Sequence, residues 1–118
     1  MKRVLAVLGL IGSCLIGGGG AVEAVSITLN PSHQNRSHGQ TAYWSMSWSG
    51  GAPYDTDFAY GDGAWWSPGL PTTTSANLNR TWWPCSSTTY NQVLYVTDGF
   101  GNFGSAGATT RVTGGTPC

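Results

Sequence analysis

The segment "TAYWSMSWS", residues 41–49, alternates apolar and mostly small polar side chains along its length. Successive side chains of a β-strand point to opposite faces, so a pattern that repeats every two residues predicts a strand with one buried face. An amphipathic helix would need a repeat of about 3.6 residues, which this segment lacks. The positions expected to face the core are Ala42, Trp44, Met46 and Trp48.

The same alternation recurs further along the chain. It extends over residues 53–63 ("PYDTDFAYGDG") and 90–98 ("YNQVLYVTD"), and shorter strands are predicted at 26–30, 75–82 and 108–113. The inward positions expected in the two longer segments are Tyr54, Thr56, Phe58, Tyr60, Tyr90, Gln92, Leu94 and Val96. Turns rich in glycine and proline separate the segments. No segment after residue 25 has the pattern of an amphipathic helix. Six or seven short strands of this kind indicate an all-β, antiparallel β-sandwich.

Residues 1–24 have the features of a secretory signal peptide. Two positive residues follow Met1, residues 4–16 are almost wholly apolar, and small side chains precede a cleavage point after Ala24. One small domain then spans residues 25–118. The protein is therefore expected to be secreted to the extracellular space or the cell surface.

This hydrophobic N-terminal leader has two alternative interpretations. The sequence "LIGSC" resembles a lipobox, which would place a lipid on Cys14. The uncharged stretch 4–22 is also just long enough to remain in a bilayer as an anchor, although four consecutive glycines make it a poor helix. The three interpretations stay open at this point.

Residues 25–118 carry few charges: three arginines, four aspartates, no lysine and no glutamate. Such a surface has no electrostatic attraction for nucleic acid or for acidic membranes, so membrane contact is expected only through a retained N-terminal segment. Neither histidine lies near a plausible nucleophile. We therefore predict a protein that is not an enzyme, with no catalytic residues and no cofactor.

Three short motifs follow one another in the order of the predicted strands. They are the Asp62-Gly63 turn after Phe58 and Tyr60, the pair Arg80-x-Trp82, and the series Tyr90-x-x-x-Leu94-x-Val96-x-Asp98. With these motifs, nearly all of residues 25–118 resembles a PKD domain, an immunoglobulin-like β-sandwich of secreted and surface proteins. The family's usual Trp-Asp-Phe is altered here to "DFAY", and "PCSSTT" replaces its Pro-Gly. The resemblance implies adhesion, spacing or assembly outside the cell, and no catalysis.

Cys85 and Cys118 are expected to form a disulfide. In this sandwich order, the loop between the fifth and sixth strands lies at the same pole as the end of the last strand. Cys85 falls in that loop and Cys118 follows the last strand, so the two can meet. A small secreted domain gains stability from such a cross-link. Two free thiols or an intermolecular bridge are the alternatives.

Adjacent tryptophans occur twice, and the first question is which of them reach the core. Neighbouring residues of a strand point to opposite faces, so only one member of the pair Trp82-Trp83 can be buried. Trp82 shares the register of Leu78. We therefore expect Trp82 in the core and Trp83 at the surface.

The second pair, Trp65-Trp66, follows the turn in "FAYGDGAWWS", residues 58–67, where the strand register is lost. The strand order places this loop at the pole of Cys85, which would gather Trp65, Trp66 and Trp83 at one tip. There the three rings either cover the end of the sandwich or form a contact surface for another subunit or for sugar rings.

The aspartate of the Gly61-Asp62-Gly63 sequence is expected to stabilise a turn, because its carboxylate can accept hydrogen bonds from backbone amides and the glycines tolerate positive φ. Calcium binding by Asp55, Asp57 and Asp62 is the alternative. Asp55 and Asp57 should leave a strand face whereas Asp62 follows the strand end, so the carboxylates do not obviously converge. We predict no metal site.

Two further kinds of polar residue are candidates for modification or binding. His33 and His38 are expected in a polar loop, without a partner at the spacing of metal ligands. The segments "NRS" and "NRT" match the N-glycosylation pattern, which makes Asn35 and Asn79 candidate acceptors.

Two functions of different classes fit these observations. The first is a secreted structural subunit that self-assembles into an extracellular filament, a surface layer or an adhesive structure. Chemically different poles would permit head-to-tail contacts and hence a homo-oligomer or polymer. The second is a carbohydrate-binding module in which Trp65, Trp66 and Trp83 stack on a polysaccharide.

Overall fold

The computed structural model describes residues 25–69 and 71–118, and the predicted leader with its Cys14 lies outside the described residues. The strands are β1 (Ile27–Asn30), β2 (His33–Arg36), β3 (Thr41–Trp48), β4 (Asp55–Ala59), β5 (Trp65–Trp66), β6 (Ser75–Thr81), β7 (Thr88–Thr97) and β8 (Phe103–Val112). Within the described ranges there is no helix, and hence none that could span a membrane. The all-β prediction is confirmed.

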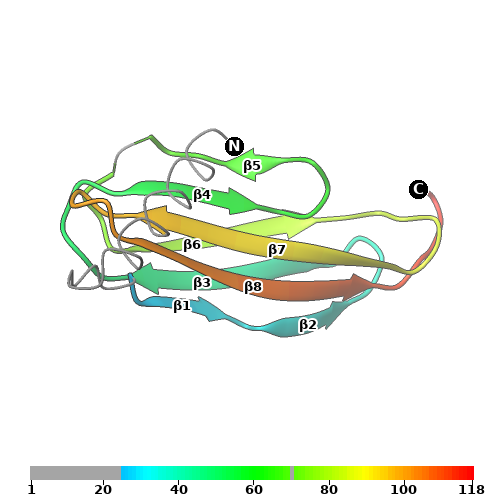
Figure 1. Cartoon of the computed structure of the whole chain (residues 1–118). Helices are drawn as coiled ribbons and strands as arrows, with labels where there is room; N and C mark the ends of the chain where they lie inside the picture. The colour runs from blue at the N-terminus through cyan, green and yellow to red at the C-terminus, as the bar shows by residue number, and fades with distance from the viewer. Residues whose placement is uncertain (1–24, 70) are drawn as a thin grey trace, which may run out of the picture.

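The strands form two sheets that pack face to face (Figure 1). The smaller sheet has the order β1-β3-β6 and is antiparallel throughout. The larger sheet has the order β2-β8-β7-β4-β5. In the larger sheet β2 runs parallel to β8, and the other neighbours are antiparallel. The sandwich is thus the predicted one, with one parallel pair added at the edge.

The chain passes from the smaller to the larger sheet between β1 and β2. β1 pairs with β3 only as far as Ser45, so β1 does not reach the backbone of Tyr43. The buried side chain of Gln34 takes its place: the Gln34 Nε2 donates to the Tyr43 carbonyl (3.0 Å), and the Gln34 Oε1 accepts from the Tyr43 amide (3.3 Å). One side chain of β2 therefore ties the edge of the larger sheet to β3.

An aromatic cluster in the core between the sheets surrounds Trp44. The Trp44 ring contacts those of Phe58, Tyr60 and Trp82 with centroid distances of 5.4, 5.9 and 6.0 Å. The predicted inward residues of β3, β4 and β7 are buried, except that Tyr60 and Tyr90 are only partly buried against the core. Burial of each large apolar side chain contributes about 1.5–3 kcal/mol, so this cluster dominates the stability of the fold.

Three segments form strands that the sequence pattern did not predict. The expectation that His33 lies in a polar loop is wrong, because it begins β2 and its Nδ1 lies 2.7 Å from Thr109 Oγ1 of β8. Trp65 and Trp66 form the short strand β5 rather than a loop. β8 begins at Phe103, well before its predicted start. Each depends on pairing with another strand, β8 for β2, β4 for β5 and β7 for the start of β8, which supplies backbone partners that local alternation does not reveal.

Two poles close the sandwich (Figure 1). The Asp98 pole contains the loops 49–54 and 98–102 together with the start of β1, and the amide of Gly99 donates to the carbonyl of Gly51 across it (2.6 Å). The disulfide pole contains the loops 37–40 and 60–64 and the C-terminal end of the chain. The loop 60–64 and the C-terminal end therefore lie at one pole, as the strand order predicted.

Candidate functional site

Asp62 anchors the turn between β4 and β5. Its Oδ1 accepts from the amide of Ala64 (3.0 Å), and its Oδ2 accepts from Trp82 Nε1 (2.7 Å) and from Arg80 Nε (2.5 Å). Burial raises the pKa of Asp62, but these hydrogen bonds and the charge of Arg80 outweigh burial and lower it below 3.8. The carboxylate holds the turn to the end of β6, which supports the turn interpretation of "FAYGDGAWWS".

The partners of Asp62 are themselves fixed by aromatic contacts. The Arg80 guanidinium lies over the Tyr60 ring, 4.8 Å from its centroid. Trp82 stacks on Tyr90 with a centroid distance of 4.2 Å and an angle of 4° between the planes. The pair Arg80-x-Trp82, one of the motifs behind the PKD resemblance, therefore joins the turn to the core.

The structure does not bring Trp65, Trp66 and Trp83 together on one surface. Trp65 and Trp66 pair with β4, so strand alternation applies to them and they point to opposite faces of the larger sheet. Trp66 packs against the core, whereas Trp65 is 37% exposed on the outer face. The prediction of one cluster is thus corrected: of the three, Trp83 alone follows β6 at the disulfide pole.

Trp83 is 57% exposed and Trp82 is buried, which confirms the assignment made from the register of Leu78. Trp83 packs beside Gly39, whose φ is +78°. A Cβ at Gly39 would lie 2.9 Å from Trp83 Nε1, so only glycine lets the loop approach the indole this closely. The Gly39 amide also donates to the Trp82 carbonyl (2.9 Å). Trp83 is therefore held in place while most of its side chain faces solvent.

Three rings form an aromatic row on the outer face of the larger sheet: Trp65, Tyr95 and Phe103. Neighbouring rings are 6.1 and 6.2 Å apart, with angles of 21° and 24° between their planes. Asp57, opposite Tyr95, is buried beside them and accepts a hydrogen bond from Ser67 Oγ (2.7 Å). The alternation of β7 predicts that Tyr95 points outward, but Phe103 lies outside any predicted strand. The row was therefore missed.

Asp98 organises the opposite pole. Its carboxylate accepts from the amides of Gly51 (3.3 Å), Phe100 (3.0 Å) and Asn102 (2.8 Å), and from Asn102 Nδ2 (2.8 Å). Burial raises the pKa of Asp98, but the hydrogen bonds from Asn102, Gly51 and Phe100 together lower it below 3.8. This network shapes the β7–β8 turn and leaves the Phe100 ring at its tip, 82% exposed.

Cys85 and Cys118 form a disulfide, the pairing expected from the sandwich order. Their Cα atoms are 5.1 Å apart and 33 positions apart in sequence. The amide of Gly115 donates to the carbonyl of Pro84 (3.0 Å), which places the two chain segments side by side next to the bridge. The cross-link therefore fastens the segment after β8 to the loop between β6 and β7.

The remaining candidates are not assembled into a reactive site. Asn35 and Asn79 are both exposed, on β2 and β6, and their glycosylation stays a prediction. No group of three histidine, cysteine or acidic side chains within residues 25–69 and 71–118 could hold a metal ion. Of the aspartates considered for calcium, Asp57 is engaged by Ser67 and Asp62 by Arg80 and Trp82.

No known protein family's sequence profile and no curated protein matches the chain. Solved structures are similar to it. One is the PKD domain of an M14-like peptidase from Thermoplasmatales archaeon SCGC AB-540-F20, at 19% identity over 77% of this chain and 92% of that one, with a TM-score of 0.52. The BIgI domain of beta protein from S. agalactiae, solved bound to CEACAM1, has 12% identity over 77% and 98%, with a TM-score of 0.54.

A third similar structure is that of the fibronectin(III)-like modules of Clostridium thermocellum CbhA, at 14% identity over 79% of this chain and 99% of that one, with a TM-score of 0.50. At such identities the similarity establishes the fold. The chain has an immunoglobulin-like β-sandwich fold, consistent with a PKD-like domain. Domains of this fold are commonly extracellular and generally non-catalytic.

Proposed function

We propose that this protein is a secreted, non-enzymatic structural subunit that assembles outside the cell through head-to-tail contacts between its two poles. The observation that carries the proposal is an exposed aromatic side chain at each pole. Phe100 is 82% exposed at the Asp98 pole, and Trp83 is 57% exposed at the disulfide pole. Aromatic side chains of this size supply much of the binding energy at protein interfaces.

Both rings are presented on ordered backbone. Phe100 sits on a turn held by Asp98, and Trp83 is fixed beside Gly39. Backbone that is already positioned in the free subunit lowers the conformational entropy lost when the ring it carries is bound. Contact between the Phe100 tip of one copy and the Trp83 surface of the next would bury both.

The two poles differ in chemistry, so a contact between them is heterologous. Repetition of a heterologous contact closes into a ring or continues as an open filament. The three arginines and four aspartates of residues 25–118 leave little net charge to oppose close packing of such chains side by side. A filament, a surface layer or an adhesive structure can be built in this way.

Electron microscopy of the purified protein tests the proposal. We expect polymers from the native chain, and their loss in both Phe100→Ala and Trp83→Ala, because each variant removes one half of the contact. Trp65→Ala is the matched control, since it removes an exposed tryptophan from the outer face of the larger sheet and should leave the polymers intact. Circular dichroism would verify that all three variants fold. Polymers that persist in both pole variants would refute the head-to-tail contact.

The aromatic row favours a carbohydrate-binding module as the second candidate. Sugar rings stack on aromatic faces, and Trp65, Tyr95 and Phe103 offer three nearly parallel rings in sequence. In this case the purified protein would be monomeric, and its tryptophan emission would shift on titration with a polysaccharide. Trp65→Ala would then remove the response that Trp83→Ala retains, which is the reverse of the pattern expected for assembly.

A further inference from the structure

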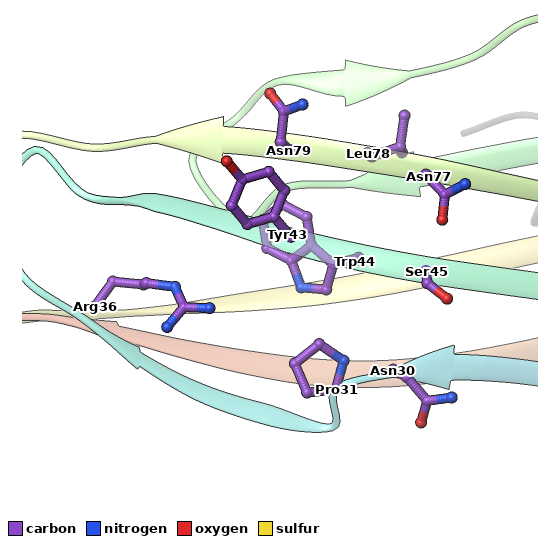
Figure 2. Close-up of a pocket in the computed structure, with 9 residues that line it drawn as sticks. All are labelled: Asn30, Pro31, Arg36, Tyr43, Trp44, Ser45, Asn77, Leu78 and Asn79. Atoms are coloured by element: carbon purple, nitrogen blue, oxygen red, sulfur yellow. The ribbon is translucent and has the colours of Figure 1, made fainter.

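A groove of about 610 Å³ opens beside β3, where the chain crosses from β1 to β2 (Figure 2). Pro31 and Arg36 line it on the side of the crossing, and Tyr43 and Trp44 of β3 line it on the other. Asn77 and Asn79 of β6 extend the lining. The groove exists because β1 stops pairing at Ser45 and β2 has moved to the other sheet.

Two N–H groups in the lining have no acceptor among the described residues. They are the Nε of Arg36 and the Nε1 of Trp44, both buried. Trp44 is only 1% exposed, and Figure 2 shows its indole nitrogen on the edge of the ring that faces Pro31 and Arg36. Buried donors are normally paired, so two unpaired donors at one groove indicate that an acceptor from outside the chain belongs there.

The charge of the groove specifies the acceptor. Arg36 contributes a permanent positive charge, and none of the residues that line the groove is acidic. Within the described part of the chain, the hydrogen bond that its guanidinium does make runs from Nη1 to the carbonyl of Asn35 (3.1 Å). A guanidinium and an indole N–H both donate, and a carboxylate accepts from both.

The rest of the lining favours a sugar as the carrier of that carboxylate. The Tyr43 ring is 59% exposed, and an exposed aromatic ring offers an apolar face for a pyranose to stack on. Asn77 and Asn79 are alternate residues of β6, so their amides stand on the same outer face. Side-chain amides both donate and accept, which suits the hydroxyl groups of a saccharide.

We propose that this groove binds an acidic saccharide, with the carboxylate at Arg36 and Trp44, the sugar ring on Tyr43 and the hydroxyls at Asn77 and Asn79. Neither Phe100, nor Trp83, nor any ring of the aromatic row lines the groove. The site therefore uses other residues than head-to-tail assembly and the second candidate function.

Paired ligands that differ only in charge test the site. The protein is made in a host without N-glycosylation, since Asn79 belongs to a sequon and lines the groove. Tetragalacturonate and its methyl ester are each titrated into the protein by calorimetry at low salt, and their affinities are compared. We expect the acid to bind at least about tenfold more tightly, and this preference to shrink as salt is added. In the NMR spectrum, the indole N–H resonance of Trp44 should move downfield with the acid.

Variants separate the charge from the sugar contact. Arg36→Gln should lose the preference for the acid, and Tyr43→Ala should weaken binding of the acid and the ester alike. Arg111→Gln is the matched control, because Arg111 is an exposed arginine of β8 that bonds Thr89 on the larger sheet, and it should behave as the native protein. Melting temperatures would verify that the variants fold.

Several results would overturn the proposal. Equal affinity for acid and ester, no binding of either, or an unchanged preference in Arg36→Gln would each remove the charged site. If acetate moved the Trp44 resonance as strongly as tetragalacturonate does at the same concentration, the carboxylate alone would explain binding, and the site would not be specific for a sugar. Polymers imaged in the Arg36→Gln variant would report on head-to-tail assembly separately.

Discussion

The two poles of the sandwich are closed by different means. At the Asp98 pole, one carboxylate collects amides from two neighbouring loops, and close backbone approach depends on glycine. Gly50, for example, has a φ of +133°, and a Cβ there would lie 2.7 Å from Asp98 Oδ2. At the disulfide pole, Asp62 joins the side chains of Arg80 and Trp82, and a covalent bridge adds to them.

The difference shows what each pole can tolerate. A network of backbone amides around one carboxylate is compact, so the loss of that carboxylate leaves several donors unpaired at once. A pole built from side chains and a disulfide spreads its stability over contacts that are far apart in sequence. We therefore expect the stability of the disulfide pole to depend most on its bridge, and the stability of the Asp98 pole to depend most on the Asp98 carboxylate.

The largest expected effect is that of removing the bridge. Cys85→Ser combined with Cys118→Ser should lower the free energy of unfolding by about 3–4 kcal/mol, because the cross-link constrains a loop of 33 positions in the unfolded chain. Urea unfolding of the double variant and the native protein measures the difference. Reduced native protein should match the double variant. A loss near zero would mean that the disulfide pole holds without covalent help.

The next effect is that of Asp98→Ala, which should cost about 2–3 kcal/mol because the amides of Gly51, Phe100 and Asn102 lose a shared acceptor. Asp62→Ala is the matched variant at the other pole. Its cost should be smaller, since the ion pair with Arg80 is partly exposed and the disulfide remains. Unfolding in urea compares the two. Equal losses would erase the distinction between the poles.

The smallest effect is the response to acid. Asp62 and Asp98 both have a lowered pKa in the folded protein, so each contributes stability above the ordinary value of 3.8. That contribution is lost as the pH falls through the folded pKa. Unfolding free energies should therefore be nearly constant around neutral pH and decline below about pH 3.8. The decline should be weaker in Asp98→Asn, and an unaltered acid profile would contradict the role assigned to Asp98.

Much of the sandwich could be predicted because its longest strands alternate strictly. In β3, each second residue is apolar, and all of these residues are buried. The same logic separated buried Trp82 from exposed Trp83. The strand order, once inferred, also brought Cys85 and Cys118 to one pole, where they are bonded.

The candidate sites were harder to predict, because each depends on which strands become neighbours. Trp65 reaches Tyr95 only because β5 pairs with β4, and β4 with β7. Arg36 reaches the groove beside Trp44 only because β2 leaves the smaller sheet. Neither contact leaves a periodic signal in the chain.

From the sequence by itself came the two-residue repeat, the choice of inward faces and the small number of charges, because these are properties of consecutive residues. Tertiary structure alone decided the parallel pairing of β2 with β8, the aromatic row and the groove with its unpaired donors. These features require segments far apart in the chain to meet, and that meeting is set by packing the two sheets together rather than by local side-chain preference.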